Sequence, residues 1–193
     1  MAIIHKTTMS PGKLELLAAW LPAQPWYLPT GRPPALARAG GFRLDDPEGE
    51  VGIEFMVVTD ASGGEPTAYH VPLTYRGAPL AGAEAALVGT TEHGVLGRRW
   101  VYDGPHDPVL TAQLLALFQG LTEPQAQSLS DTPDPTVTAR YDGPEPAGAD
   151  ALTVTRVLGD AAPAAEPLGE LTAGWTGPDG TAHRGVFASL AAR

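Results

Sequence analysis

One stretch of the chain concentrates the side chains that could do chemistry. Residues 91–107 hold two histidines, three carboxylates, two arginines and a tryptophan. A histidine beside a carboxylate can exchange protons near neutral pH, so Glu92 or Asp107 next to a histidine could act as an acid–base pair. His93, His106 and a carboxylate could instead bind a metal ion, although the two histidines form no helical i, i+4 pair.

The same stretch has a structural interpretation, which we favour. Asp103 and Asp107 would organise a turn and a helix cap, Trp100 would be core, and the arginines would bridge to carboxylates. An interaction surface on this frame is the remaining possibility, because arginine and tryptophan are common anchors. The candidate surface comprises His93, Arg98, Arg99, Trp100, Asp103, His106 and Asp107, with His70 and Arg76 from an earlier strand.

The motifs of independent catalysis are missing from the sequence. It contains no phosphate-cradling glycine loop, no Gly-x-Ser-x-Gly and no His-Glu-x-x-His. The series of base and metal-holding residues that a kinase needs is also missing. We therefore expect no catalytic residue, no cofactor site and no metal site, and a protein that is not an enzyme.

The composition restricts the classes of binding partner and the cellular compartment that we expect. With 22 acidic and 12 basic residues the net charge is −10, which disfavours nucleic acid and anionic membranes as partners. There is no cysteine, and no apolar run approaches the length of a membrane span. These features predict a cytoplasmic protein, with its oligomeric state left open.

The elements that position these residues follow from periodicity and turn signals. Leucines at helical spacing predict helices near 11–21 and 107–119, and a capping-box pattern predicts a shorter helix after Thr122. A short strand is expected at 2–8, and alternation between residues 42 and 76 predicts an antiparallel meander. Pro72 would make the last of its strands an edge or a bulged strand. On that strand, His70, Thr74 and Arg76 share one face, which we interpret as solvated.

The second part of the chain is expected to be rich in β-strands. Strands are predicted at 136–141, 151–158, 168–176 and 181–190, with a hairpin turn at 177–180. The fold class is therefore α+β, with a curved antiparallel sheet. We expect a single domain over 1–193, in which 1–130 forms one part and 136–193 either completes the same sheet or forms a separate β unit.

Several blocks of the sequence resemble the N-terminal cap domain of bacterial maltokinases. They are 4–8 (Ile-His-Lys-Thr-Thr), 17–22 (Leu-Ala-Ala-Trp-Leu-Pro), 26–27 (Trp-Tyr), 43–47 (Arg-Leu-Asp-Asp-Pro), 69–77 (Tyr-His-Val-Pro-Leu-Thr-Tyr-Arg-Gly) and 93–103 (His-Gly-Val-Leu-Gly-Arg-Arg-Trp-Val-Tyr-Asp). The resemblance covers roughly residues 2–120. It implies a curved antiparallel sheet with a few helices packed on one side, and a stand-alone cap without the kinase lobes. No catalytic residue of the family carries over.

Three functions remain open. The leading hypothesis is a non-catalytic accessory or interaction module in α-glucan, maltose or trehalose metabolism, with a kinase or glucan-metabolising enzyme as partner. The second is a domain that binds a small ligand or carbohydrate through Trp26, Trp175 or residues 92–107, because tryptophans can stack on sugars. The third is a small enzyme that uses His93 and His106.

Overall fold

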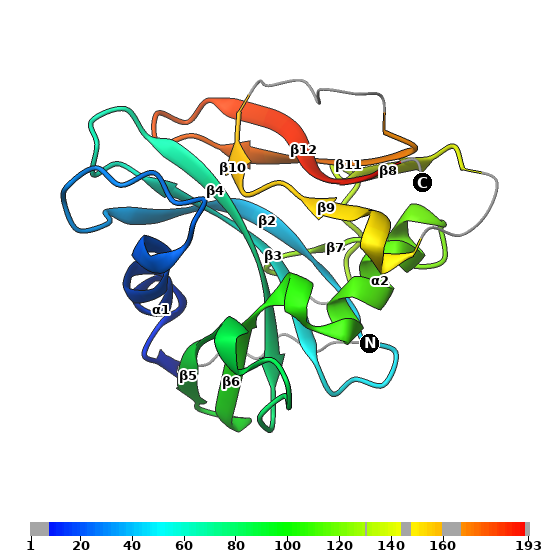
Figure 1. Ribbon diagram of the computed structural model, residues 1–193, viewed down its shortest axis with the longest axis horizontal. Coiled ribbons are helices and arrows are strands. Elements are labelled where there is room, and N and C mark those ends of the chain that lie inside the picture. The colour runs from blue at the N-terminus through cyan, green and yellow to red at the C-terminus, as the bar shows by residue number, and fades with distance from the viewer. Residues whose placement is uncertain (1–7, 130, 144–147, 160–166, 192–193) are drawn as a thin grey trace.

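The computed structural model describes residues 8–129, 131–143, 148–159 and 167–191 (Figure 1). Antiparallel strands supply most of the regular structure. In chain order they are β1 (Met9–Ser10), β2 (Leu36–Leu44), β3 (Gly52–Asp60), β4 (Thr67–Arg76), β5 (Leu87–His93), β6 (Gly97–Asp103), β7 (Gln125–Ala126), β8 (Thr138–Tyr141), β9 (Leu152–Val154), β10 (Val157–Leu158), β11 (Gly169–Thr176) and β12 (Ala182–Leu190). The helices are α1 (Lys13–Trp20) and α2 (Pro108–Phe118). The predicted α+β class with a curved antiparallel sheet is confirmed.

The strands of the described residues belong to one sheet. Its hydrogen-bonded order is β1-β5-β6-β4-β3-β2-β11-β12-β9, while β10 pairs with β4, β7 with β2 and β8 with β11. The meander predicted between residues 42 and 76 is present as β2-β3-β4, in which Phe42 lies opposite Phe55 and Phe55 opposite Pro72. The predicted hairpin turn at 177–180 joins β11 to β12.

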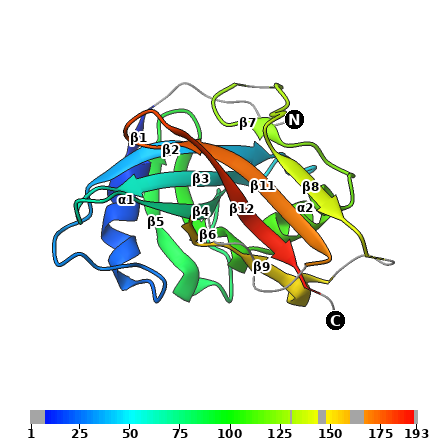
Figure 2. The same ribbon diagram turned by 90° about the horizontal axis from the view of Figure 1, so that it is seen from above.

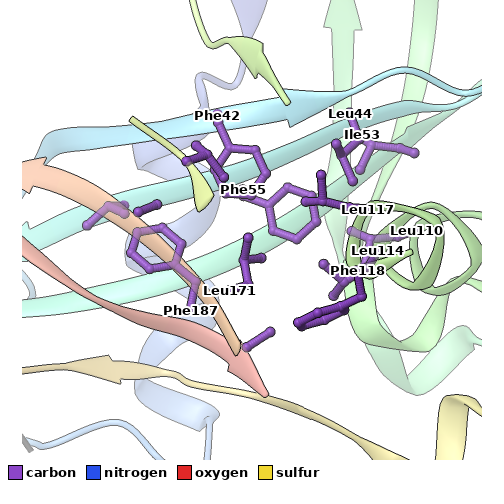
Figure 3. Packing of buried hydrophobic residues seen from close by; sticks show 14 of the residues in the cluster. Phe42, Leu44, Ile53, Phe55, Leu110, Leu114, Leu117, Phe118, Leu171 and Phe187 are labelled. Atoms are coloured by element: carbon purple, nitrogen blue, oxygen red, sulfur yellow. The ribbon is translucent and has the colours of Figure 1, made fainter. Parts of the chain in front are cut away.

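Both faces of the central strands are buried, and each face has its own core. Phe55 of β3 packs with Phe42, with Phe187 of β12 and with the apolar side of α2 (Figure 3). The next residue, Met56, lies in a second cluster with Leu17 of α1. Because successive side chains of a strand point to opposite faces, α1 and α2 cover opposite faces of the sheet. The expectation that the helices pack on one side is therefore wrong, since each apolar face requires its own cover.

Helix α2 begins where the sequence predicts a start, whereas α1 begins at Lys13, two residues after the predicted bound. The side chain of Asp107 accepts a hydrogen bond from the amide of Val109 at 2.9 Å, and Pro108 occupies the first helical position of α2. Gly120, with a φ of +69°, follows the end of that helix. At the start of α1, the carboxylate of Glu15 accepts from the amide of Gly12 at 2.6 Å.

The β11–β12 hairpin joins strand β2 at a glycine. Trp175 of β11 pairs with Gly40 of β2, and the two strands of the hairpin cross over β2 and β3 (Figure 2). A Cβ atom on Gly40, whose φ is +149°, would stand 3.3 Å from the Cα atom of Trp175. Glycine at this position permits the close approach. Strands β8, β9, β11 and β12 thus extend the sheet that β2, β3 and β4 begin.

Three local predictions require comment. The helix predicted after Thr122 is wrong: Gln125 and Ala126 instead form β7, because they pair with β2. Strand β4 is central and not an edge, yet Pro72 is tolerated because β10 pairs at residues 68–69 and β6 from Leu73 onward, so neither reaches residue 72. The strand predicted at 2–8 lies, apart from Thr8, outside the described residues.

Candidate functional site

A cavity of about 910 Å³ lies where the ends of β2, β3 and β4 meet the β5–β6 hairpin. Its volume is in the range of small-molecule sites. Five basic side chains line it: Lys13, Arg43, Arg76, His93 and Arg99. Because strand register places Arg43 directly opposite Glu54, these two side chains leave the sheet on the same face.

Glu54 is the centre of a hydrogen-bond network in this cavity. Glu54 is only 4% exposed. The ammonium group of Lys13 donates to its Oε2, the hydroxyl of Tyr75 donates to the same atom at 2.7 Å, and the amide of Gln127 donates to Oε1 at 2.8 Å. Glu54 is therefore fully satisfied by neighbours from three other segments of the chain.

The charges of this network are fixed by its geometry. Burial opposes ionisation of Glu54, but the charge of Lys13 and the donated hydrogen bonds hold the pKa of the carboxyl below its usual value. Burial and the adjacent carboxylate raise the pKa of Tyr75 well above its usual value. Near neutral pH the cavity floor therefore consists of a carboxylate, an ammonium group and a neutral phenol.

Two of the cavity arginines have no carboxylate partner among the described residues. Arg43 donates to the carbonyl oxygens of Ala126 at 3.3 Å and Leu129 at 3.2 Å. Arg99 donates from Nη2 to the carbonyl oxygen of Leu96 at 2.8 Å, and its buried Nε has no hydrogen-bond partner. A guanidinium carries five N–H donors, so both arginines retain donors for which the described chain offers no acceptor.

Arg76, which also lines the cavity, is held by the cap of α2. Its Nε and Nη2 atoms bond the two carboxylate oxygens of Asp107 at 2.6 and 2.7 Å. Asp107 is completely buried. Burial opposes its ionisation, but the hydrogen bonds from Arg76 and Val109 hold the pKa of Asp107 below its usual value. The structural role that the sequence suggests for Asp107 is thus observed.

Asp103 forms a similar pair with an arginine from far along the chain. Nη1 and Nη2 of Arg156 lie 2.8 and 2.7 Å from its two carboxylate oxygens. His106 Nε2 is 3.7 Å from Oδ2 of Asp103, and its side chain is 62% exposed. The guanidinium of Arg156 also lies 5.0 Å from the ring centre of Trp26. Asp103 is therefore an attachment point for the C-terminal part, and not an exposed surface residue.

His70 and Thr74 are completely buried, so the solvated face assigned to them is wrong. His70 lies between the rings of Phe55 and Phe187, and its Nδ1 atom is 2.9 Å from the carbonyl oxygen of Thr155. Burial lowers the pKa of His70 to about 3. The residue cannot belong to an exposed surface, because Phe187 of β12 and the backbone of Thr155 contact its ring.

The structure separates the remaining candidates into two places. His93 and Arg99 line the cavity, Arg98 is exposed beside them, and Trp100 is half-buried on the same strand. His106 lines a different, smaller hollow beside Pro105. His93 and His106 therefore do not share a cavity. Trp175, proposed as an exposed sugar-stacking residue, is only 7% exposed, which removes it as a stacking surface, whereas Trp26 is half-buried.

Sequence reasoning missed the residues at the centre of the cavity: Lys13, Arg43, Glu54, Tyr75 and Gln127. One signal could have found Glu54. It is the single charged residue between Val51 and Val58, and a carboxylate in so apolar a strand needs a partner. Lys13 and Gln127 could not be paired with it, because they are distant in sequence.

Two further observations concern metals and membranes. Across 8–129, 131–143, 148–159 and 167–191, no three histidine, aspartate or glutamate side chains gather as a metal ion would require. Within those same ranges no helix has the length and apolar character needed to cross a bilayer.

The fold and this site define an α+β protein in which a curved antiparallel sheet carries a mixed-charge cavity at one end. Residues 20–107 of the chain match the family model described as the maltokinase N-terminal cap domain. The resemblance drawn from the sequence is thereby confirmed for these residues, which include β2 to β6 and all the residues that line the cavity except Met9, Lys13 and Gln127. No curated protein matches the chain.

Proposed function

We propose that this chain is a non-catalytic accessory module that docks on a kinase or glucan-metabolising enzyme of maltokinase-type sugar metabolism. The match of residues 20–107 to the maltokinase cap supports the pathway. The observation that carries the docking role is the tip of the β5–β6 hairpin, where Val95 is 60% and Leu96 is 46% exposed.

The hairpin has the properties of a preorganised contact surface. Nδ1 of His93 accepts hydrogen bonds from the amides of Val95 and Leu96 at 3.3 and 3.1 Å, which fixes the turn. The hydroxyl of Thr91 bonds the carbonyl oxygen of Pro11 at 2.8 Å and anchors the strand below. A surface that is already ordered loses little conformational entropy on binding.

The surroundings of the tip also suit a protein contact. Arg98 and Glu92 form an exposed pair at 3.0 Å next to the apolar residues. An apolar centre with a charged rim is the usual arrangement of a protein interface. Two exposed apolar side chains on a rigid hairpin therefore offer an anchor, and the rim offers selectivity.

Binding of the purified chain to a maltokinase from the same organism, followed by biolayer interferometry, tests this proposal. Val95→Asp places a charge in the contact, and we expect it to weaken binding by about tenfold or more. Leu28→Asp is the matched control, because Leu28 is 53% exposed but lies outside the hairpin. Equal affinities for the wild type and Val95→Asp would contradict docking through this hairpin.

The non-catalytic part of the proposal has its own test. We expect the purified chain, supplied with ATP, Mg²⁺ and maltose, to form no maltose phosphate above the protein-free rate. Turnover that scales with protein concentration and disappears in His93→Ala would contradict the accessory role and support the enzyme hypothesis.

A further inference from the structure

The cavity has a charge character unlike that of the whole chain. The protein carries 22 acidic and 12 basic residues, yet Lys13, Arg43, Arg76 and Arg99 line this one cavity against Asp46, Glu50 and Glu54. Convergence of a third of the basic residues on one concave site in an acidic protein is not required by the fold alone.

Two of the three acidic residues of the cavity, Glu54 and Asp46, already accept hydrogen bonds from within the chain. Both oxygens of Glu54 are bonded, as described above. The carboxylate of Asp46 accepts from the amides of Glu48, Glu50 and Val51 at 3.1, 3.0 and 2.9 Å. These carboxylates therefore neither pair with Arg43 and Arg99 nor offer free acceptors to them.

The unmatched groups in the cavity are donors. Arg43 and Arg99 bond main-chain carbonyl oxygens only, within the described residues, and each has N–H groups to spare. Lys13 uses one of its bonds on Glu54 and retains others. A ligand that completes this site must bring acceptor oxygens, and the guanidinium fork is best matched by an oxyanion.

We propose that the cavity binds a small organic oxyanion, whose phosphate or carboxylate group accepts hydrogen bonds from the free N–H groups of Arg99. The ligand's body lies against the Lys13–Glu54–Tyr75 floor. The three acidic lining residues and the overall negative charge disfavour polyanions, so the ligand carries a single anionic group. This site goes beyond the proposed docking function: Leu96 borders both surfaces, but Val95, which the docking test changes, does not line the cavity.

Isothermal titration calorimetry of the full chain tests the site with defined probes. They are inorganic phosphate, a hexose monophosphate, a hydroxy monocarboxylate of similar size, and the uncharged hexose. We expect saturable binding of the hexose phosphate or of the carboxylate, and none of the uncharged sugar. The phosphate ester and carboxylate arms distinguish the two sources of the oxyanion. Absence of saturable binding by every anion, or equal binding of the uncharged hexose, would overturn the proposal.

Neighbouring arginines provide a matched pair of variants. Arg99→Gln and Arg98→Gln each remove one positive charge, but Arg98 is 61% exposed, pairs with Glu92 and does not line the cavity. We expect Arg99→Gln to weaken the binding of the anionic probe by about tenfold or more, and Arg98→Gln to leave it unchanged. An equal loss in both variants would show a general charge effect and would overturn the site.

Two further measurements keep the test decisive if Arg99→Gln is unstable. Arg43→Gln removes another positive charge that lines the cavity, on strand β2, and should also weaken binding. Amide chemical shifts of the wild type need no variant at all. Perturbations on adding the anionic probe should concentrate at Gly52 and Gly77, which line the cavity, and perturbations confined to other parts of the chain would overturn the proposal.

Discussion

Two bidentate arginine–carboxylate pairs serve different purposes in this molecule. Arg76–Asp107 lies within the part that matches the maltokinase cap and fixes the start of α2. Arg156–Asp103 reaches from the segment between β9 and β10 back to the end of β6. Their geometry and burial are similar, with carboxylates that are 0% and 6% exposed. The same chemistry therefore caps a helix in one place and attaches the C-terminal part in the other.

The largest effect is expected from breaking the first pair. Asp107→Ala leaves Arg76 without its partner and removes the cap of α2, so we expect a loss of about 3–5 kcal/mol in the free energy of unfolding, measured with urea. Asp107→Asn retains a cap acceptor and should lose less. A loss below about 1 kcal/mol for the alanine variant would mean that this pair contributes little.

Breaking the second pair should have a smaller and more local effect. We expect Arg156→Met to cost about 2–3 kcal/mol, because His106 and solvent can still reach Asp103. Hydrogen exchange should accelerate at residues 152–158 and at the facing part of β4, while α2 keeps its protection. Uniform acceleration, including α2, would show that the two pairs stabilise one cooperative unit.

Low pH should weaken the attachment of the C-terminal part at Arg156, because His70 contacts the same segment. The amide of His70 donates to the carbonyl oxygen of Arg156 at 2.9 Å, and its ring contacts Thr155. The pKa of His70 is about 3 in the folded protein, whereas its ordinary value is 6.5. Below pH 6.5 the histidine therefore binds a proton in the unfolded chain but not in the folded one. Stability should fall with decreasing pH by about 1.4 kcal/mol per unit.

Denaturant titrations between pH 7 and 4.5 isolate this effect. The lowered carboxyl pKa values of Glu54, Asp60 and Asp107 contribute stability that is lost only at lower pH, below their ordinary values of 4.5 and 3.8. His70→Phe should flatten the slope even if it lowers stability throughout. An unchanged slope in that variant would assign the acid sensitivity to other groups.

The smallest effect is expected at an exposed arginine–carboxylate pair with a similar N–O distance. Arg140 and Asp142 lie 2.8 Å apart, with side chains that are 51% and 71% exposed. Asp142→Asn should change the free energy of unfolding by less than about 0.5 kcal/mol, because water screens the charges. A loss as large as that of Arg156→Met would contradict burial as the source of the difference.

Local signals were sufficient to predict much of the fold. The leucine stripe and the Asp-Pro start defined α2, and alternation defined β3 and β4. The segment 87–93 was not recognised as a strand because Gly89 interrupts its pattern. In the structure this glycine lies at a bulge against α1, where a Cβ would be 2.7 Å from Leu16. Such contacts between segments distant in sequence leave no local pattern.

The site was less accessible to prediction than the fold. His93 and Arg99 were singled out and do line the cavity, but His70, Asp103 and Asp107 are buried. Polar residues on alternate positions of a strand indicate a solvated face only if nothing covers that face. Here Phe187 of β12 and the backbone of Thr155 cover it, and their position depends on pairings that the sequence of β4 does not encode.

The contact between Gly40 and Trp175 also bears on how fast the chain folds. The hairpins β3–β4, β5–β6 and β11–β12 each join neighbouring segments and need only short loops to close. Pairing of β2 with β11 must bring together residues 40 and 175. Closing this long loop costs conformational entropy before the stabilising contacts between the two strands can form. We therefore expect the hairpins to form early, and the union of β2 with β11 to limit the rate of folding.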